Sequence, residues 1–294
     1  MISRKLTILV CVVCVAVVMM MAGGVQCVAQ SPAEDSAQSD GFFASWQNRV
    51  SDTLAQQPAW PIPVITASSG LLQVARTDFV RQIAPAGTDT WNYGNTKGIN
   101  LIPWYKVEFD VLLPPYIQHN SKAEDGFGDV SLLLKYRLAA GNAEAGNYSI
   151  SFSVAGTMPT GQYKNGSLGS TVSPTLCAGK GFGKVDVQST LGAVLPADYT
   201  AKLGRVVVWN SVAQYHAGKL FWPEIESNTT FYHGGPNNGR AQNFITPGIM
   251  VSKFKLERNP RNRLALMFGG GMQIATTRFH TYNHGLVITT RMQF

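Results

Sequence analysis

From about residue 71 to the C-terminus, the chain consists of segments of roughly ten residues in which apolar and polar side chains alternate. In the segment 106–113, Val107, Phe109 and Val111 alternate with Glu108 and Asp110. Successive side chains of a β-strand point to opposite faces, so each such segment has one apolar face and one polar face. The pattern predicts an all-β fold.

Twelve candidate strands can be placed in this region, and no helix is predicted among them. They cover residues 71–81, 96–103, 106–113, 127–138, 147–156, 171–181, 184–194, 205–216, 219–231, 243–255, 261–274 and 284–294. Such strands fit either a soluble β-sandwich with a dry core or a membrane barrel with a polar interior.

The connections between the strands favour the barrel. Short connections near 104–105, 139–146, 182–183, 217–218 and 256–260 alternate with longer ones near 82–95, 114–126, 157–170, 195–204, 232–242 and 275–283. A transmembrane barrel has short periplasmic turns and longer extracellular loops, whereas a sandwich has no reason to alternate them. We therefore predict a transmembrane antiparallel β-barrel of about twelve strands, closed because an open edge in lipid would leave backbone groups unpaired.

Aromatic residues gather near both ends of the predicted strands, as in the two interfacial girdles of membrane barrels. One set lies near the short turns: Trp104, Tyr105, Tyr136, Tyr148, Tyr215, Trp222, Phe254 and Phe294. The other lies near the long loops: Phe79, Trp91, Phe127, Phe231, Tyr232, Phe244, Phe279 and Tyr282. The low charged fraction, 14% against the usual ~25% of soluble domains, also suits an outer surface that does not face water.

The N-terminus has the features of a secretory signal peptide. Arg4 and Lys5 precede an apolar run over 6–22, and small residues follow, which predicts residues 1–29 as a signal peptide cleaved after Ala29. An uncleaved anchor helix is the alternative. Cleavage leaves Cys177 as the one cysteine, so no internal disulfide is expected. It also removes two of the 24 basic residues, which leaves 22 against 17 acidic residues, a scattered net charge of +5 that gives no reason to expect nucleic acid as a partner.

The predicted mature chain begins with an N-terminal periplasmic segment, residues 30–69, ahead of a barrel over 70–294. Phe43, Trp46, Val50 and Leu54 recur at helical spacing, which predicts a short amphipathic helix. Prolines at 58, 61 and 63 end it and form a boundary. The sequence leaves open whether this helix is a plug, a lid or a periplasmic strut.

The chain ends in Phe294, on the apolar face of its last strand. A terminal phenylalanine in this position resembles the C-terminal signal of bacterial outer-membrane proteins. Together with the signal peptide it predicts location in the bacterial outer membrane, with the barrel-assembly machinery and outer-membrane lipid as partners.

Two stretches resemble a known family. Residues 126–138, Gly-Phe-Gly-Asp-Val-Ser-Leu-Leu-Leu-Lys-Tyr-Arg-Leu, are similar to the G-x-G-D-v-x-l-x-x-K-Y-r motif of a bacterial transporter family also labelled "putative MetA-pathway of phenol degradation". Residues 106–114 and 282–294 resemble further strands of that family, so the similarity covers roughly residues 70–294. The resemblance implies an outer-membrane β-barrel with a transport role, and it carries no defined site residues.

Catalytic and cofactor motifs are not found, so the chain is not expected to be an enzyme or to bind a cofactor or metal. Barrel phospholipases and proteases need a histidine beside a serine or an acid, and none of the five histidines has that setting. They are His119, His216, His233, His280 and His284. The His233–Gly239 run consists of turn formers, and the three glycines at 269–271 lack the lysine and helix of a phosphate loop.

The polar face of the strands supplies the candidate functional residues. Placing Arg or Lys on the lipid face costs ~2–4 kcal/mol at the midplane, so charged strand residues are expected to face the lumen. The candidates are Lys106, Glu108, Asp110, Lys135, Arg137, Glu224, Glu226, Arg263 and Arg291. They would either pair and close a narrow barrel, or line a lumen that passes small solutes.

These observations predict an outer-membrane channel for small-molecule solutes, and hydrophobic or aromatic solutes are the candidates. The first alternative is a structural barrel that binds partners through its loops without transport. The second, less favoured, is a lipid-modifying barrel enzyme.

Overall fold

The computed structural model describes residues 41–162, 164–256 and 263–294, which belong to one compact unit. The predicted signal peptide and its cleavage site lie outside the described residues. Among the described residues, no helix has the length and hydropathy needed to cross a membrane.

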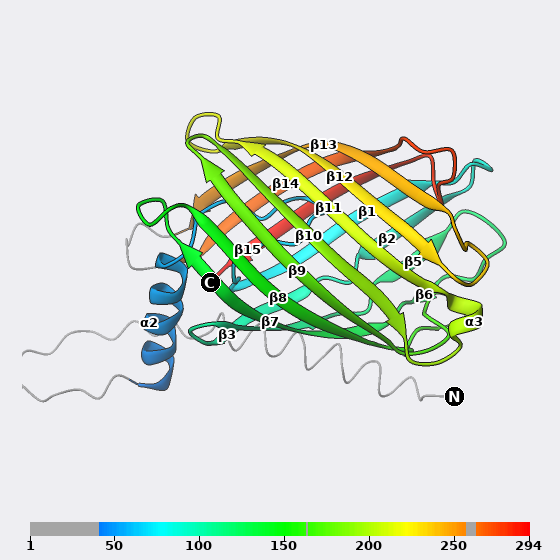
Figure 1. The fold of residues 1–294 in the computed structure, drawn as a ribbon, viewed down its shortest axis with the longest axis horizontal. Helices are drawn as coiled ribbons and strands as arrows, with labels where there is room; N and C mark the ends of the chain where they lie inside the picture. The colour runs from blue at the N-terminus through cyan, green and yellow to red at the C-terminus, as the bar shows by residue number, and fades with distance from the viewer. Residues whose placement is uncertain (1–40, 163, 257–262) are drawn as a thin grey trace, which may run out of the picture. The chain divides into compact units, whose positions relative to one another are not determined.

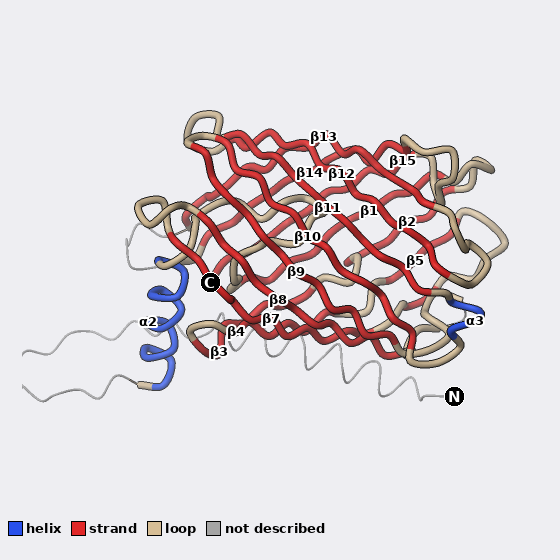
Figure 2. The backbone as a smooth tube through the Cα atoms, in the orientation of Figure 1, coloured by secondary structure: helices blue, strands red, loops and turns tan. Residues whose placement is uncertain are grey.

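The described chain is a closed antiparallel β-barrel, which confirms the predicted fold class (Figures 1 and 2). Neighbours along the chain pair antiparallel from β7 to β15, and β15 pairs with β1 in register from Val74–Gln293 to Ile83–His284. The strands are β1 (Val74–Ile83), β2 (Asp89–Gly94), β3 (Gly98–Trp104), β4 (Val107–Leu112), β5 (Tyr116–His119), β6 (Gly126–Phe127), β7 (Val130–Gly141), β8 (Tyr148–Met158), β9 (Thr171–Phe182), β10 (Val185–Pro196), β11 (Arg205–Tyr215), β12 (Phe221–His233), β13 (Ala241–Lys255), β14 (Ala265–Ala275) and β15 (His284–Gln293).

The fifteen segments make twelve wall strands, because three of the strands are each interrupted once. β2 and β3 are two parts of one strand, and both pair with β1. β4 and β5 together form the next wall strand, and β6 and β7 form the one after it. Asn95 and Thr96 adopt left-handed φ angles of 46° and 50° at the first break, and two prolines, Pro114 and Pro115, occupy the second. Backbone bonds from Leu113 N to Lys97 O (3.1 Å) and from Gly128 N to Pro115 O (2.8 Å) keep the wall continuous there.

The burial pattern of the wall is the reverse of that in a soluble protein. Along β7, Leu134 and Tyr136 are 55% and 46% exposed, whereas Lys135 and Arg137 are each only 4% exposed. The same exchange of an exposed apolar face for a buried polar face occurs in β8, β10 and β12. The outer surface is therefore apolar, as a barrel surrounded by lipid requires.

The barrel has two unlike ends. We call the end with the turns 105–106, 142–147, 183–184 and 216–220 and the C-terminus the short-turn end, and the opposite end the long-loop end. Two long loops are shorter than predicted, 84–88 and 120–125, because β2 and β5 extend the wall there. In this extension Trp91 and Tyr93 alternate with Thr90 and Asn92, which is the pattern of a strand. The prediction of a loop over 82–95 was therefore too long.

Aromatic residues at the long-loop end divide into two groups. Phe79, Trp91, Tyr93, Tyr116 and Phe127 form a chain of ring contacts on the outer face of β1, β2, β5 and β6. Four other members of the predicted girdle instead gather at the mouth of the lumen: Tyr232, Phe244, Phe279 and Tyr282. The first group has the position of an interfacial girdle, as does Phe231, which is 37% exposed on the outer face of β12.

The predicted N-terminal helix is present as α2 (Phe42–Ala55). Val50 packs with Leu71 and Ile102, and the Trp46 Nε1 donates to the Ile102 carbonyl (2.9 Å), so the helix lies at the short-turn end (Figure 1). A single further helical turn, α3 (Thr200–Leu203), lies in a loop at the opposite end.

Candidate functional site

Residues 56–73, which we call the N-terminal segment, lie inside the barrel rather than beside it. The segment has no helix or strand up to Gln73, and its prolines at 58, 61 and 63 lack backbone donors. Buried backbone groups need hydrogen-bond partners, and a segment without secondary structure cannot supply them itself. Side chains from the inner face of the wall supply them here.

Two glutamates of β12 bind consecutive amides of the segment. Glu224 Oε1 accepts from Val64 N (2.8 Å), and the Glu226 carboxylate accepts from Ile65 N (2.7 Å), Thr66 N (2.6 Å) and the Thr66 hydroxyl (2.5 Å). Both carboxylates are buried. Hydrogen bonds from amides to a carboxylate are among the stronger ones in proteins, so these bonds fix the middle of the segment.

Basic side chains bind the carbonyl groups of the same stretch. Arg291 of β15 donates to Ile62 O and to Pro63 O (2.6 Å for the latter), and Arg76 of β1 donates to Val64 O (2.6 Å). Arg76 is also paired with Asp78 (2.8 Å). Residues 62–66 are thus held by acids on one side and by arginines on the other.

A buried ion pair holds the end of the segment that leads into β1. Lys135 Nζ lies 2.8 Å from Glu108 Oε1 and also donates to Gly70 O (3.3 Å), while Glu108 Oε2 accepts from Leu72 N (2.6 Å). Both side chains are at most 5% exposed. Burying an ion pair costs free energy when its remaining polar atoms lack partners. The hydrogen bonds to Gly70 O and Leu72 N supply such partners to this pair.

Neutral polar side chains hold the stretch between these two groups. Ser149 and Ser151 of β8 each donate to Ser69 O (2.9 Å), and the Gln188 side-chain oxygen accepts from Ser69 N (3.1 Å). Near the helix, Arg137 Nη1 donates to Thr53 O (2.7 Å) and to Gln57 Oε1 (3.2 Å). Wall strands on several sides of the lumen therefore bind this one segment.

The segment also buries apolar side chains against the wall. Ile62 and Val64 pack with Val80, Met250 and Val287 on the inner faces of β1, β13 and β15. Full burial of an isoleucine or valine side chain is worth ~1.5–3 kcal/mol. Hydrophobic packing and hydrogen bonding thus act on the same residues.

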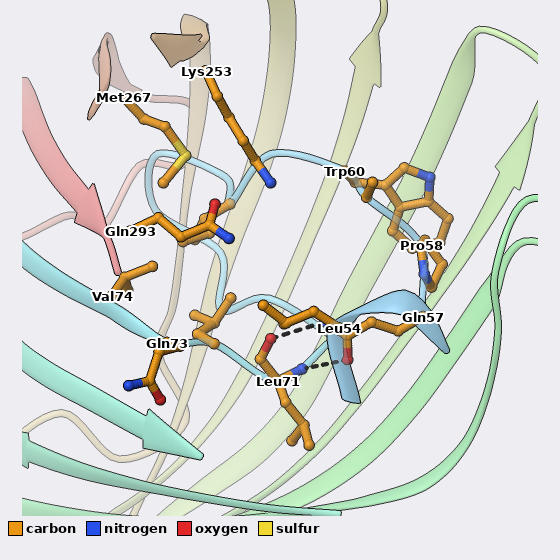
Figure 3. A pocket seen from close by; sticks show the side chains of 13 residues that line it. Leu54, Gln57, Pro58, Trp60, Leu71, Gln73, Val74, Lys253, Met267 and Gln293 are labelled. Carbon is orange, nitrogen blue, oxygen red and sulfur yellow. Dashed lines mark hydrogen bonds between the residues drawn. The ribbon is translucent and has the colours of Figure 1, made fainter. Parts of the chain in front are cut away.

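A small cavity remains beside the segment, near the short-turn end (Figure 3). Its volume is about 80 Å³, and its lining includes Leu54, Trp60, Leu72, Lys253 and Met267. Gln57 crosses its edge to pair with Leu71, accepting from Leu71 N (3.0 Å) and donating to Leu71 O (2.8 Å). A cavity that holds benzene is ~150 Å³, so this one is too small for an aromatic solute.

The long-loop half of the lumen is different along β8 to β12, because the inward-facing side chains there are only half-buried. On β8 to β12, inward residues nearer the short turns are buried, for example Ser151, Gln188 and Glu226, whereas those nearer the long loops are accessible. The accessible inward positions are Ala155, Thr157, Thr171, Ser173, Thr175, Gly192, Val194, Pro196, Val206, Val208, Asn210, Thr230 and Tyr232. None of these thirteen residues is charged. We call this part of the lumen, along β8 to β12 at the long-loop end, the vestibule.

Aromatic residues lie at the mouth of the vestibule on the β12–β15 side. Phe244 stacks on Tyr282 with ring centroids 4.2 Å apart, and Tyr232 meets Phe279 edge-on at 5.6 Å. Burial raises the pKa of Tyr282, which follows β14 in a loop, to about 12, so its hydroxyl remains neutral.

The Gly126–Asp129 motif has a structural role at the same end. The Asp129 carboxylate accepts from Gly161 N (2.8 Å) and Ser167 N (2.6 Å), which ties the 159–170 loop to the start of β7. A side chain on Gly166 would come within 2.4 Å of Asp129, so the loop requires glycine there. The motif that carries the family resemblance thus shapes one wall of the vestibule.

The structure places the predicted lumen-facing residues in two groups. Seven are buried at inward wall positions: Glu108, Asp110, Lys135, Arg137, Glu224, Glu226 and Arg291. Lys106 instead lies exposed in the turn before β4, because the preceding strand ends at Trp104. Arg263 precedes β14 and donates to the Ser51 hydroxyl (2.6 Å) and the Phe294 carbonyl (3.4 Å), so it joins α2 to the C-terminus and does not line the lumen.

Residues 30–69 were predicted as a periplasmic segment ahead of the barrel, with a plug as one of three roles left open for its helix, so the place of residues 56–70 in the lumen was not predicted. Arg76, Asp78 and Gln188 were not among the predicted lumen-facing residues, although their alternate positions on β1 and β10 carried the signal. The segment itself has no periodic pattern, and its place depends on wall residues far away in the chain.

No metal site was found in the part of the chain that the structure describes, where no three His, Cys, Asp or Glu side chains are grouped to hold an ion. Among the histidines, His119 and His280 hydrogen-bond to Asn165 (2.7 Å) and Asn283 (2.9 Å) in the loops.

Known structures and one family resemble this chain. An outer-membrane channel from Pseudomonas putida F1 is 15% identical, with a TM-score of 0.53 over 82% of this chain and 98% of that one. The NanC porin and another porin give lower TM-scores, 0.48 and 0.35, at 7% and 8% identity, over 75% of this chain and 98% and 100% of theirs. The first likeness shows that the fold is that of an outer-membrane channel barrel.

No curated protein matches the chain. The family model described as "Putative MetA-pathway of phenol degradation" matches residues 62–234, which run from the N-terminal segment to the end of β12. This match spans more than half of the chain and includes both the Gly126–Asp129 motif and Glu224 with Glu226. The protein is therefore a member of this family.

Proposed function

We propose that the protein is an outer-membrane channel for small uncharged solutes of hydrophobic or aromatic character, and that the N-terminal segment closes it in the state described here. The long-loop end faces the outside of the cell, and the short-turn end faces the periplasm. Solutes enter the vestibule and reach the periplasm when the segment moves.

The observation that carries this proposal is the division of the lumen into two halves. The periplasmic half is filled by one segment bound to charged wall residues, whereas the vestibule is accessible and uncharged. A barrel that served only as a scaffold would have no use for an accessible vestibule above a removable segment.

The vestibule lining supports the solute class. Its side chains are small, aliphatic or hydroxyl-bearing, such as Val206, Val208 and Thr175, with aromatic rings at the mouth. Such a surface solvates neutral molecules with apolar parts, while offering no charged partner to an ion. The description of the family points to phenol-like compounds and supports the same class.

The segment is suited to movement because it forms no β-ladder with the wall. Its bonds are made by side chains such as Glu226, Arg291 and Lys135, which can exchange the segment for water without any strand leaving the barrel. Once the segment has left, these charges would line the periplasmic half as a hydrated passage. Strand pairing across β1 and β15 would be unchanged.

A disulfide between the segment and the wall tests the proposal. A Cβ on Gly179 of β9 would lie 2.6 Å from the Ser69 Oγ and 2.7 Å from the Trp60 ring, so Ser69→Cys with Gly179→Cys brings two sulfurs close to each other once the Trp60 ring shifts. Cys177 is replaced by serine in this variant to prevent mispairing. Single-channel currents are recorded in planar bilayers before and after reduction, and each single cysteine variant serves as the control.

We expect openings in the wild type and in the reduced variant, and none in the oxidised variant. Equal currents in the oxidised and reduced forms would refute closure by the segment. A wild type that never conducts would refute the channel itself and favour the structural or loop-binding barrel.

The solute class is tested in intact cells by the initial uptake of phenol, benzoate and glucose at equal concentration. We expect the channel to raise the uptake of phenol most, because it alone is both aromatic and uncharged. Equal rates for all three would refute selectivity while leaving transport in place.

A further inference from the structure

The first turn of α2 exposes two adjacent phenylalanines. Phe42 and Phe43 are 74% and 69% exposed, and their rings pack on one another with centroids 5.5 Å apart. Side chains of this size at such exposure mark a contact surface more often than a surface in water.

The two rings continue the stripe of the helix that binds the barrel. Phe43 precedes Trp46 by three residues and Val50 by seven, and Phe42 precedes Trp46 by four, so all lie along one side of the helix. Val50 and Trp46 are covered by the barrel, whereas the two phenylalanines are not. The stripe is thus longer than the protein surface that it packs against.

The uncovered end of the helix lies near the apolar belt of the barrel. The Trp46 indole is bonded to Ile102 O, and the turn that follows exposes Trp104 and Tyr105 (65% and 50%). Figure 1 shows α2 across the short-turn end, with its first turn extending past the edge of the wall near β3. Tryptophan and tyrosine in this position mark the level of the membrane interface.

We propose that Phe42 and Phe43 insert into the periplasmic leaflet of the membrane beside Trp104 and Tyr105, so that α2 is an interfacial anchor for the N-terminal segment. The occupant of this surface is phospholipid, because the surface continues the lipid-facing belt of the wall. Exposed polar residues of the helix, such as Asn48 and Asp52, remain in water, as in other helices that lie in the interface.

Insertion of α2 into the membrane interface explains how the start of the N-terminal segment stays at the barrel when the rest of the segment moves. α2 passes directly into the N-terminal segment, and Arg137 binds Thr53 O at the junction. A helix held by lipid at its first turn and by Trp46 in the middle would remain at the membrane when the segment leaves the lumen. The inference requires only that the barrel spans a bilayer, so it does not depend on transport.

Photo-crosslinking to lipid tests the anchor. The full exported protein is reconstituted into vesicles of phosphatidylethanolamine and phosphatidylglycerol, with p-benzoylphenylalanine in place of Phe42, Phe43, Asn48 or Trp104 in separate variants. Asn48 lies on the exposed polar side of the same helix and is the matched negative control, and Trp104 is the positive control for insertion of the barrel. Lipid adducts are counted by mass spectrometry after illumination.

We expect at least several-fold more lipid adducts from positions 42 and 43 than from position 48, at a level similar to position 104. Adducts at 104 together with background levels at 42 and 43 would overturn the anchor while leaving the barrel in the membrane. Equal adducts at 42, 43 and 48 would also overturn it, since they would indicate lipid contact without a preferred face.

Discussion

The two halves of the lumen are built from opposite kinds of residue. The short-turn half holds buried charges, and three of them, Glu226, Lys135 and Arg291, bind the N-terminal segment. The vestibule has uncharged inward residues that water reaches. Inward and outward side chains alternate in the same way along the whole wall. The lumen is nevertheless closed near the short turns and accessible along β8 to β12 near the long loops.

The difference shows that the charges and the segment depend on each other. A buried charge is costly unless it is paired or hydrogen-bonded, and a buried backbone without secondary structure needs partners in the same way. In the short-turn half, Glu226, Arg291 and Lys135 on the wall and the backbone of the segment satisfy each other. In the vestibule, Asp129 binds the 159–170 loop in the same way at the wall, whereas the small neutral side chains at the accessible positions are hydrated at little cost.

Removing the segment should have the largest effect on this contrast. Deletion of residues 41–70 from the exported protein removes α2 and most of the segment, and it should open the short-turn half, because the β1–β15 pairing begins only at Val74 and closes the barrel without them. We expect the mean current in planar bilayers to rise several-fold.

Heat-modifiable migration on gels verifies that the deletion variant still forms a barrel. A folded deletion variant with the current of the wild type would contradict the division of the lumen, since it would mean that the segment does not obstruct the pore.

Loss of one acid should loosen the segment without removing it. Glu226→Ala leaves Ile65 N, Thr66 N and the Thr66 hydroxyl without their acceptor. The free energy that holds the segment in the lumen should fall by about 3 kcal/mol. Hydrogen exchange at residues 64–66 should become faster, and channel openings more frequent. Glu144→Ala, which removes an exposed acid from the 142–147 turn, is the control and should change neither.

Breaking the bonds between Asp129 and the 159–170 loop should alter the vestibule without releasing the N-terminal segment from the lumen. Asp129→Ala removes the acceptor for Gly161 N and Ser167 N, which should destabilise the 159–170 loop by about 2 kcal/mol. Limited proteolysis from the extracellular side should then cut this loop faster. Hydrogen exchange at residues 64–66 should stay as in the wild type, and acceleration there would mean that the two halves are coupled.

The smallest effect on stability, but a clear one on selectivity, is expected from a charge in the vestibule. Val208→Glu places a carboxylate at an accessible inward position, where it stays hydrated and should cost less than ~0.5 kcal/mol. The reversal potential in a salt gradient should shift toward cations. Asn238→Glu, at the tip of an outer loop, adds the same charge outside the lumen and should shift it far less.

Much of the wall could be predicted because its signal is local. Alternation along β7 and β15 identifies the strands, and the charged positions of β4, β7 and β12 identify the inner face. Lys106 and Arg263 were misplaced because both lie at strand ends, where a shift of one or two residues in the boundary decides whether a side chain belongs to the wall. The interrupted strands were shortened in the prediction for the same reason, since Pro114 and Pro115 resemble a loop.

The position of the N-terminal segment depends on contacts between distant parts of the chain and could not be predicted from local patterns. Its prolines and mixed residues at 56–70 have neither the period of a helix nor that of a strand, so the sequence describes them as a boundary, and residues 71–73 were predicted as the start of the first strand, which begins at Val74. Its partners, Glu226 and Arg291, are about 160 and 229 residues away along the chain. They meet it only because the closed wall brings β12 and β15 around one lumen.

The sequence by itself therefore determined the barrel, the apolar outside, the polar inside and the short helix, because the two-residue period of a strand and the 3.6-residue period of a helix are written in neighbouring residues. Only the tertiary structure decided that the lumen is closed in one half and accessible in the other. That outcome depends on hydrogen bonds between inward charges and a distant segment without secondary structure, and such bonds leave no periodic pattern in the sequence.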